Sequence, residues 1–468
     1  MVHEKIKIDK RNKKHYSGHI STYSDRYMTK EIPKYEMPRE GMPANAAYQL
    51  IHDELNLDGN PSLNLASFVT TWMEPEADKL IMENLNKNFI DHDEYPQTEE
   101  IHQRVVNMLG RLFNAPPQKT FLGTATIGSS EAVMLGGLSH KFSWRNRRKK
   151  QKKPYGKPNM VMGENTHTVW HKFARYFDVE PRFISLKPGK YTINAKDVEK
   201  LIDENTICVV TTIGTTFTGE ADDIEGINNL LVKVKKKKGW DIGIHVDGAS
   251  GAFIAPFVHK KLKWDFRLEQ VKTINASGHK YGLVYPGLGW LIFRDKKDLP
   301  DDLVFNVNYL GGEMPTYTLN FSRGGGMIIA QYYNLIRMGK AGYTRIMKNM
   351  METAQYLAGK IKKSGKFVMQ STPTLMPLVT FQLKGKPGFS EYDLSDKLRE
   401  HGWIVPAYSM PPKAESVVVM RVVMKENFSR DMADNFFEDL LKAYDALSGK
   451  AKKVRKREKK QYRVQGIC

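Results

Sequence analysis

Lys280 lies in the string SGHKYG at positions 277–282, directly after a strand-like run from Val271 to Ala276. A second string, IHVDGASGA at 244–252, has the pattern of a short buried strand that ends in Asp247 and small residues. A lysine amine forms a Schiff base with an aldehyde, and a carboxylate pairs with a protonated pyridine nitrogen. The two strings therefore predict chemistry with pyridoxal 5'-phosphate (PLP), attached at Lys280 and paired with Asp247. The alternatives are a surface lysine, one of 72 Lys and Arg residues, and an aspartate that caps a strand end.

A third string, TIGSSEA at 126–132, opens an expected helix. Glycine allows close approach of the backbone, Ser129 and Ser130 carry hydroxyl donors, and a helix N-terminus offers free N–H groups. The string is thus typical of a phosphate site. The alternative is simple N-capping by serine, with Glu131 in the first turn. The presence of Lys280 and Asp247 elsewhere in the chain favours the phosphate.

Strand-like and helix-like segments alternate from Leu63 to about Phe321. The expected helices cover 98–113 and 130–144, and the expected strands cover 159–162, 206–212, 243–246, 273–275 and 289–293. This alternation predicts an α/β fold with a large, mostly parallel sheet covered by helices. Ligands of such sheets bind at the carboxyl ends of the strands, where Asp247 and Lys280 fall.

The sequence after Gly326 changes to a long helix, short strands at 378–383 and 416–423, and a helix at 430–447, which predicts a smaller C-terminal α+β domain. A short amphipathic helix is expected at 46–55 in the N-terminal segment. We therefore predict an N-terminal arm at 1–62 in a dimer interface, a large PLP-binding domain at 63–325, a small domain at 326–449 and a basic tail at 450–468.

Composition limits the remaining classes of function. No stretch of eighteen apolar residues occurs, so no membrane span is expected, and no zinc-ligand spacing is present. Cys208 lies in an apolar run and is expected to be a buried thiol, and the N-terminus lacks an apolar signal segment, so we expect a cytoplasmic protein. The net charge of +20 is concentrated at 145–153, 233–238 and 450–463, which we interpret as solvated loops, a helix end and a frayed tail.

Several of these strings, with NLASF at 64–68, 91–96, 127–138, 170–176, 305–323 and VVMR at 418–421, resemble the PLP-dependent group II amino-acid decarboxylases. Within that family the resemblance is to the glutamate decarboxylases, and it runs from about Met37 to about Leu447. It implies a fold type I PLP enzyme, a dimer with shared active sites, and decarboxylation of L-glutamate to 4-aminobutanoate and carbon dioxide.

The resemblance also implies roles for individual residues. Lys280 would carry the cofactor and Tyr309, on a loop expected to close over the site, would deliver a proton; Tyr317 is a second candidate. The expected cofactor contacts are Ser129, Ser130, Thr216, Asp247, Ala249, Ser277, His279 and, from the other subunit, Ser322. The expected substrate contacts are Ser67 and Phe68 for the distal carboxylate, Asp91 from the partner, and Arg421 for a carboxylate.

His167 departs from the pattern. It corresponds to the residue that stacks on the cofactor ring, where glutamate decarboxylases commonly have glutamine and many other group II members have histidine. His167 favours an aspartate or aromatic amino-acid decarboxylase, whereas Ser67, Asp91 and Arg421 favour an acidic substrate. A transaminase or another PLP-dependent lyase would share the fold and the lysine. Plant members of the family carry a calmodulin-binding tail, but this basic tail lacks large apolar anchors and interleaved aromatics, so we expect it to bind neither calmodulin nor nucleic acid.

Overall fold

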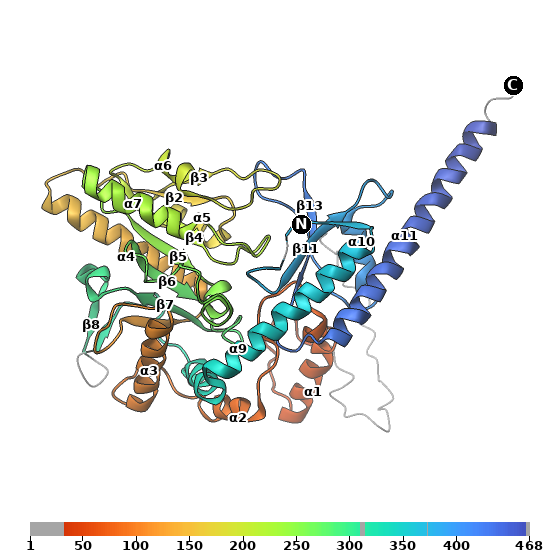
Figure 1. Ribbon diagram of the computed structural model, residues 1–468. Helices are drawn as coiled ribbons and strands as arrows, with labels where there is room; N and C mark the ends of the chain where they lie inside the picture. Colours follow the sequence, from red (N-terminus) through yellow and green to blue (C-terminus); the bar gives the residue numbers. More distant parts are fainter. Residues whose placement is uncertain (1–31, 309–313, 372, 465–468) are drawn as a thin grey trace. The chain divides into compact units, whose positions relative to one another are not determined.

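A computed structural model describes residues 32–308, 314–371 and 373–464, and it describes side chains up to Gly449 (Figure 1). The chain divides into two compact units, one that ends at Asn60 and one that begins at Pro61. The described part of the first unit holds α1 (Ala44–Leu55), close to the predicted helix. The second unit holds all other elements. The predicted boundaries of its domains, and of the arm, stay predictions.

A seven-stranded sheet forms the centre of the second unit, with the strand order β1-β7-β6-β5-β4-β2-β3 (Figure 1). The neighbours from β3 through β6 run parallel, and β7 is antiparallel to both of its neighbours. The strands are β1 (Gly123–Thr126), β2 (Asn159–Gly163), β3 (Glu180–Ile184), β4 (Thr206–Thr212), β5 (Gly243–Asp247), β6 (Val271–Ala276) and β7 (Gly289–Phe293). The prediction of a mostly parallel sheet is confirmed.

Helices cover both faces of this sheet because its central strands are apolar on both sides. Val209 and Val246 belong to one apolar cluster, with residues of α7 (Ile224–Lys238), and Met160 and Val210 belong to another, with residues of α4 (Ser129–Lys150). All side chains of β4 and β5 are buried. The remaining helices of this region are α2 (Pro75–Glu83), α3 (Pro96–Leu112), α5 (Thr168–Tyr176), α6 (Ala195–Glu199) and α8 (Ala255–Val258).

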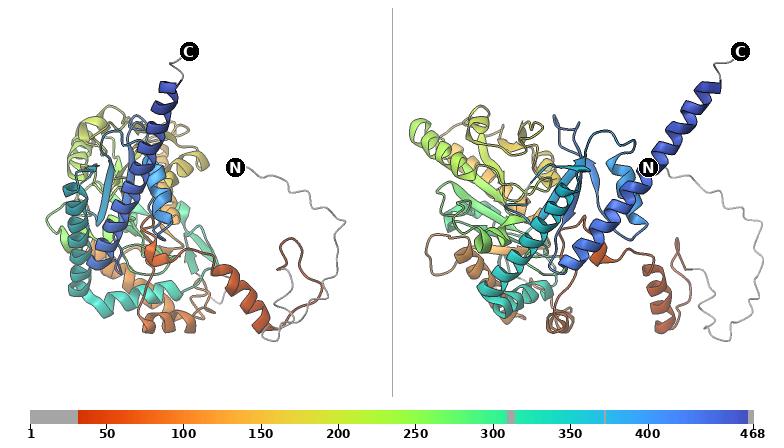
Figure 2. Two further views of the ribbon diagram at one scale, coloured as in Figure 1. Left: turned by 90° about the vertical axis from the view of Figure 1, so that its right-hand side faces the viewer. Right: turned by 45° about the vertical axis from the view of Figure 1, so that its right-hand side comes forward.

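A second, antiparallel sheet follows, in the order β10-β11-β13-β12. Its strands are β10 (Phe367–Met369), β11 (Leu378–Leu383), β12 (Ala407–Ser409) and β13 (Val418–Val423); β8 (Phe305–Val307) and β9 (Met314–Thr316) pair separately. The long helix α9 (Gly326–Lys363) bends at Gly339, which has a φ of 55°. It packs against α11 (Arg430–Val464), which also contacts α10 (Glu391–Arg399) (Figure 2). The smaller α+β region is therefore confirmed.

Two expectations about the basic runs meet different outcomes. The run after Trp144 was expected to be a loop, and that is wrong: α4 continues to Lys150, and Arg148 is buried with an ion pair to Glu204 at 3.0 Å. The second run does end a helix, α7. Cys208 is a buried free thiol, as predicted. Across the described residues, no helix is long and apolar enough to cross a membrane, and no cluster of potential metal ligands occurs.

Candidate active site

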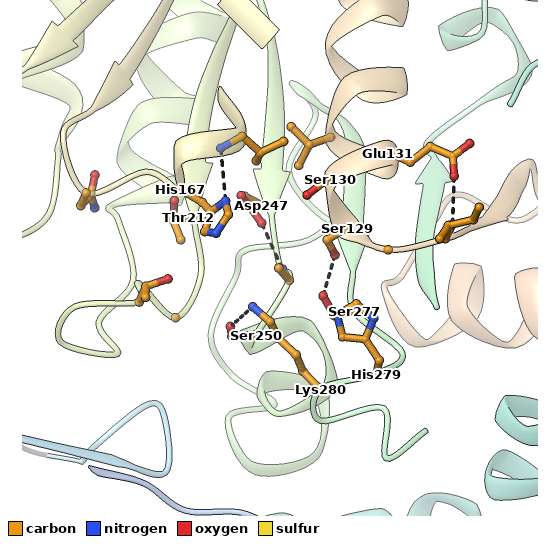
Figure 3. Close-up of a pocket in the computed structure, with 18 of the residues that line it drawn as sticks. Ser129, Ser130, Glu131, His167, Thr212, Asp247, Ser250, Ser277, His279 and Lys280 are labelled. Carbon is orange, nitrogen blue, oxygen red and sulfur yellow. Dashed lines mark hydrogen bonds between the residues drawn. The ribbon is translucent and has the colours of Figure 1, made fainter. Parts of the chain in front are cut away.

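A cavity of about 480 Å³ opens at the carboxyl ends of the parallel strands (Figure 3). Its volume is in the range of small-ligand sites. Nine of the predicted site residues line it, drawn from α4, the loops after β2, β4, β5 and β6, and the start of α5: Ser129, Ser130, His167, Thr216, Asp247, Ala249, Ser277, His279 and Lys280.

Lys280 is held in a tight turn after β6. Its carbonyl accepts a hydrogen bond from the Thr70 hydroxyl at 2.7 Å, and its Nζ donates to the Ser250 hydroxyl at 3.1 Å (Figure 3). Burial lowers the pKa of Lys280 to about 8; Asp247 opposes this shift, and the positive charge of Arg421 adds to it. A substantial fraction of this amine is thus neutral near pH 7–8, as a nucleophile requires.

Three donors fix the carboxylate of Asp247 at the end of β5. Trp170 Nε1 donates to Oδ2 at 3.0 Å, while Asn275 Nδ2 and the backbone N–H of Ala249 donate to Oδ1, each at 3.1 Å. The carboxylate is buried yet lines the cavity, so it remains able to accept one more proton donor from a ligand. A protonated pyridine nitrogen meets that requirement.

A chain of buried hydrogen bonds continues from Asp247 across the sheet. Asn275 Oδ1 contacts His245 Nε2 at 2.8 Å, and Thr273 Oγ1 contacts His245 Nδ1 at 2.8 Å and His140 Nε2 at 2.9 Å. Burial lowers the pKa of His245 to about 4 and that of His140 well below its usual value, so both rings are neutral near pH 7.

The donor directions in this chain follow from the carboxylate, which only accepts. The amide N–H of Asn275 must face Asp247, which leaves Oδ1 to accept from His245 Nε2–H. The bare Nδ1 of the neutral His245 ring then accepts the hydroxyl proton of Thr273, whose oxygen accepts from His140 Nε2–H. Every donor therefore points toward Asp247.

The N-terminus of α4 provides a cradle for a phosphate. Gly128 occupies the N-cap position and no side chain caps the helix, so the alternative of capping by serine is wrong. The Ser129 and Ser277 hydroxyls lie 2.7 Å apart. Burial lowers the pKa of His279 to about 4, and its Nδ1 accepts from the backbone N–H of Leu288, which leaves Nε2–H as a donor. A Cβ on Gly128 would lie 3.3 Å from the His279 ring, so glycine keeps this cradle open.

Arg421 and Phe68 lie beside the cavity. The Arg421 guanidinium lies over the Phe68 ring at 4.8 Å, and Lys280 Nζ lies 5.2 Å from the same ring. Arg421 donates to the carbonyls of Ala66 and Thr216, each at 2.6 Å, while its Nε is buried without a partner. Among the described residues no carboxylate forms an ion pair with it. This buried cation can accept a carboxylate ligand. The neighbouring Ser67 hydroxyl accepts from the backbone N–H of Val69.

His167 lies at the start of α5, where its Nδ1 accepts from the backbone N–H of Val169 at 3.2 Å (Figure 3). The neutral ring therefore carries its proton on Nε2. Part of the ring remains exposed, yet the cavity walls withdraw enough water to lower its pKa; Asp247 opposes the shift, and Lys280 and Lys172 add to it. His167 is thus placed to contact a ligand as a neutral donor.

Besides Ser67, Phe68 and Arg421, two further predicted residues of the described chain do not line this cavity. Asp91 and Ser322 are absent from its lining; they belong to neighbouring segments, since Asn88 Nδ2 contacts Ser322 Oγ at 3.4 Å and Phe89 N donates to Arg323 O. Tyr309 lies outside the described residues. The other tyrosine considered, Tyr317, donates its hydroxyl proton to the Gly123 carbonyl at 2.7 Å.

Several residues of the site have no role in the sequence-based prediction. Glu131 is buried and accepts backbone N–H donors from Ile127, Leu319 and Asn320, at 2.9 to 3.1 Å. It thereby joins the loop before the phosphate cradle to a segment far along the chain. Thr212 lines the cavity with a buried hydroxyl that has no partner. The string around Asp247 contained one further signal, Ser250, the hydroxyl that contacts Lys280.

The residues present fit PLP. The cavity combines uncapped helix N–H groups and hydroxyls for a phosphate, a carboxylate for a ring nitrogen, and a partly neutral lysine for an aldehyde. The unpartnered hydroxyl of Thr212 adds a polar atom that a ligand would satisfy.

Comparisons with known proteins agree with this chemistry. Residues 33–384 match the pyridoxal-dependent decarboxylase conserved domain. The chain is 52% identical to a glutamate decarboxylase of Petunia hybrida, over 91% of this chain and 86% of that protein. It is 49% identical to one from Aliivibrio fischeri, over 89% and 90%. A solved glutamate decarboxylase of Lactobacillus brevis superposes with a TM-score of 0.88, at 41% identity over 91% of this chain and 97% of that structure.

Proposed function

The chain belongs to the pyridoxal-dependent decarboxylase family, and we propose that it converts L-glutamate to 4-aminobutanoate and carbon dioxide. Its large mostly parallel sheet and smaller antiparallel sheet have the fold type I architecture. The observation that carries the choice of an acidic substrate is the buried Arg421 guanidinium, which forms no ion pair with a carboxylate among the described residues and shares the Phe68 ring with Lys280. Glutamate has one carboxylate to lose and a second to bind. The reaction consumes one proton, which replaces the lost carboxylate on the α-carbon.

The cofactor is PLP, which supplies, when bound, an aldehyde that bonds to amines and a ring that withdraws electrons from the α-carbon. Ser129, Ser130, Ser277 and His279 bind its phosphate together with the first turn of α4. Asp247 holds the proton of the pyridine nitrogen. The hydrogen-bonded chain behind Asp247 keeps its carboxylate in one orientation.

Lys280 is the nucleophile that carries the cofactor between turnovers. Its depressed pKa lets it attack near neutral pH and also lets it accept and return a proton. His167 lines the cavity and would lie against the cofactor ring, with its Nε2–H free to hydrogen-bond the substrate carboxylate. Ala249 is small enough to allow a ring to lie against it, and Thr216 also lines the site. Tyr309 is proposed as the proton donor to the α-carbon.

Substrate choice depends on the Ser67 hydroxyl and the Arg421 guanidinium, together with the aromatic ring of Phe68. Arg421 pairs with a carboxylate of glutamate, and the Ser67 hydroxyl hydrogen-bonds the distal carboxylate beside Phe68. An arginine provides two parallel donors to a carboxylate, which fixes the pose as well as the charge.

We propose a homodimer in which Asp91 and Ser322 complete the active site of the partner. Their position on adjoining segments outside their own cavity supports this. The test mixes two inactive variants, Lys280→Ala and Ser322→Ala, after partial unfolding and reassembly. If Ser322 acts in the partner's site, mixed dimers regain activity, because one site then has both residues. Mixtures that stay as inactive as the separate variants would contradict a shared site.

A cytoplasmic location is also proposed, supported by the free buried thiol of Cys208. For the basic tail we propose no role in calmodulin or nucleic-acid binding. Fluorescence anisotropy with calmodulin and with labelled RNA, before and after removal of residues 450–468, tests this point.

Product analysis tests the activity itself. Protein reconstituted with PLP is incubated with L-glutamate, L-aspartate, L-tyrosine or L-dihydroxyphenylalanine, and amine and carbon dioxide are quantified. We expect 4-aminobutanoate from glutamate alone and no turnover by Lys280→Ala. Release of an aromatic amine or of a product of aspartate instead would mean that His167 reports the substrate class and that Ser67 does not bind a distal carboxylate. Keto-acid products would identify a transaminase.

A further inference from the structure

A second cavity, of about 620 Å³, opens at the amino ends of the parallel strands, whereas the active site lies at their carboxyl ends. Gly243, the first residue of β5, lines this cavity, whereas Asp247, the last residue of β5, lines the active site. Four residue steps along a strand span about 13 Å, so the two cavities are separate. The second half of α4, the starts of β4 to β6 and the segment after β7 form its walls.

The lining of this cavity is strongly basic. It contains six cationic side chains against three aspartates, a formal excess of three positive charges. The cations come from α4, from α7, from β6 and from the segment after β7: Arg147, Lys150, Lys235, Lys272, Lys296 and Lys297. Two of the basic runs seen in the sequence therefore converge on one concave surface.

Most of these cations have no anionic partner. Lys235 pairs with Asp241 at 3.0 Å, and Lys297 lies 3.7 Å from Asp295. Within the described part of the chain, the other four form no ion pair with a carboxylate. Arg147 instead donates to the carbonyl of Asp241, and Lys272 donates to that of Glu269. The positive charges are thus gathered on one surface and only partly neutralised by the three aspartates.

The floor of the cavity is polar and partly desolvated. Ser139 and the neutral His140 are buried there, and Asp298 Oδ2 is buried without a hydrogen-bond partner. Burial lowers the pKa of Lys272. The positive charges of Lys235 and Arg294 lower this pKa further, whereas the negative charges of Asp298 and Asp241 raise it. Burial also lowers the pKa of Arg147. A bound anion would relieve the cost of holding these cations together.

We propose that this basic cavity binds a small oxyanion with two or more negative charges, of the phosphate or phosphomonoester class. Its volume suits a small ligand rather than a polymer. Arg147 offers a planar fork for two oxygens, and the lysines act as point charges around it. None of the residues that line this cavity lines the active site, although His140 ends the hydrogen-bonded chain that leads to Asp247.

Calorimetric titration of inorganic pyrophosphate into the PLP-loaded full-length protein tests the site. The cofactor's own phosphate then fills the cradle at α4, so binding reports on other sites. We expect saturable binding of one pyrophosphate per chain, weaker at high salt because the ions screen it. Chloride at equal ionic strength should not compete specifically. Absence of saturable binding up to millimolar pyrophosphate would overturn the proposal.

Matched charge changes locate the binding. The exposed pair Lys150→Gln and Lys296→Gln should weaken binding about tenfold, since each removes a unit charge facing the ligand. The control pair Lys233→Gln and Lys236→Gln removes the same charge from exposed positions of α7 outside the cavity. It should change the affinity for pyrophosphate by less than about twofold. Equal weakening by both pairs would show adsorption by net charge only and would refute the site.

Removal of a negative charge from the cavity gives an independent test, because it should strengthen rather than weaken anion binding. Asp298→Asn removes a half-buried carboxylate that interacts with Lys272 and Lys297, and it should tighten the binding of pyrophosphate by about threefold. Because this variant gains affinity, misfolding cannot imitate the expected result. Unchanged or weaker binding by Asp298→Asn, with the fold verified by circular dichroism, would contradict an anion seated in this cavity.

Discussion

Replacement of Thr273 with valine should destabilise the protein by about 2–6 kcal/mol, although valine has nearly the same shape. The Thr273 side chain is fully buried, and its hydroxyl bonds both His140 and His245. Valine leaves His140 Nε2–H and His245 Nδ1 without partners. Each unpaired buried polar group costs about 1–3 kcal/mol. Two such groups give the stated range. The loss of stability falls at its lower end if the two imidazole rings shift so that one satisfies the other.

The assay is chemical denaturation of the apoprotein in urea, followed by far-ultraviolet circular dichroism, together with the midpoint of thermal unfolding. Thr211→Val is the matched control, because Thr211 is equally buried on β4 of the same sheet but its hydroxyl makes one long contact of 3.5 Å. We expect the control to lose less than about 1 kcal/mol. If Thr273→Val is as stable as Thr211→Val, the hydrogen bonds of Thr273 to His140 and His245 do not stabilise the fold.

Three further predictions concern the active site. Attachment of PLP to the apoprotein, followed by absorbance in a stopped-flow instrument, should accelerate as pH rises and level off above about 8, since the neutral Lys280 amine attacks and burial has lowered its pKa; a midpoint near 10 would mean an ordinary solvated lysine. Glu131→Gln should weaken PLP binding about tenfold, because an amide nitrogen must face a backbone N–H of Ile127 or of the 319–320 segment; unchanged affinity in a fluorescence titration would argue against a role in shaping the cradle. Arg421→Lys keeps the charge but loses the fork, so the KM for glutamate should rise about 10–100-fold with a smaller change in kcat, and a change confined to kcat would contradict a binding role.

The sequence predicted the centre of the sheet better than its edges. The mainly apolar runs at 206–212 and 289–293 matched β4 and β7, because a strand buried on both faces has no regular alternation of polar residues. The edge strand β3 was missed, since its first two residues, Glu180 and Pro181, are exposed and proline is tolerated only at such a position. The end of α4 was also misjudged, because charged residues were taken as solvent-facing although the buried Arg148 pairs with Glu204.

The structure brings together predicted site residues that belong to short local strings of the sequence. Lys280, Asp247 and the Ser129–Ser130 pair all line one cavity. Glu131 was seen only as a first-turn acid, because its partners at Leu319 and Asn320 lie almost 190 positions away. Thr273 and His140 gave no signal at all, since an isolated threonine or histidine in an apolar segment shows nothing of its cross-strand neighbours.

The two carbonyls bound by Arg421 have a consequence for the evolution of new specificities. One guanidinium on β13 holds the backbone at Ala66, in the segment before Phe68, and at Thr216, after β4. An apolar residue at 421, as an aromatic substrate would favour, removes the Arg421 donors from both part-buried carbonyls and releases two loops that form the site. A change of substrate therefore requires at least two coordinated substitutions, one that removes the charge and one that replaces its donors. The enzyme's preference for an acidic substrate is in this sense protected by its own architecture against single mutations.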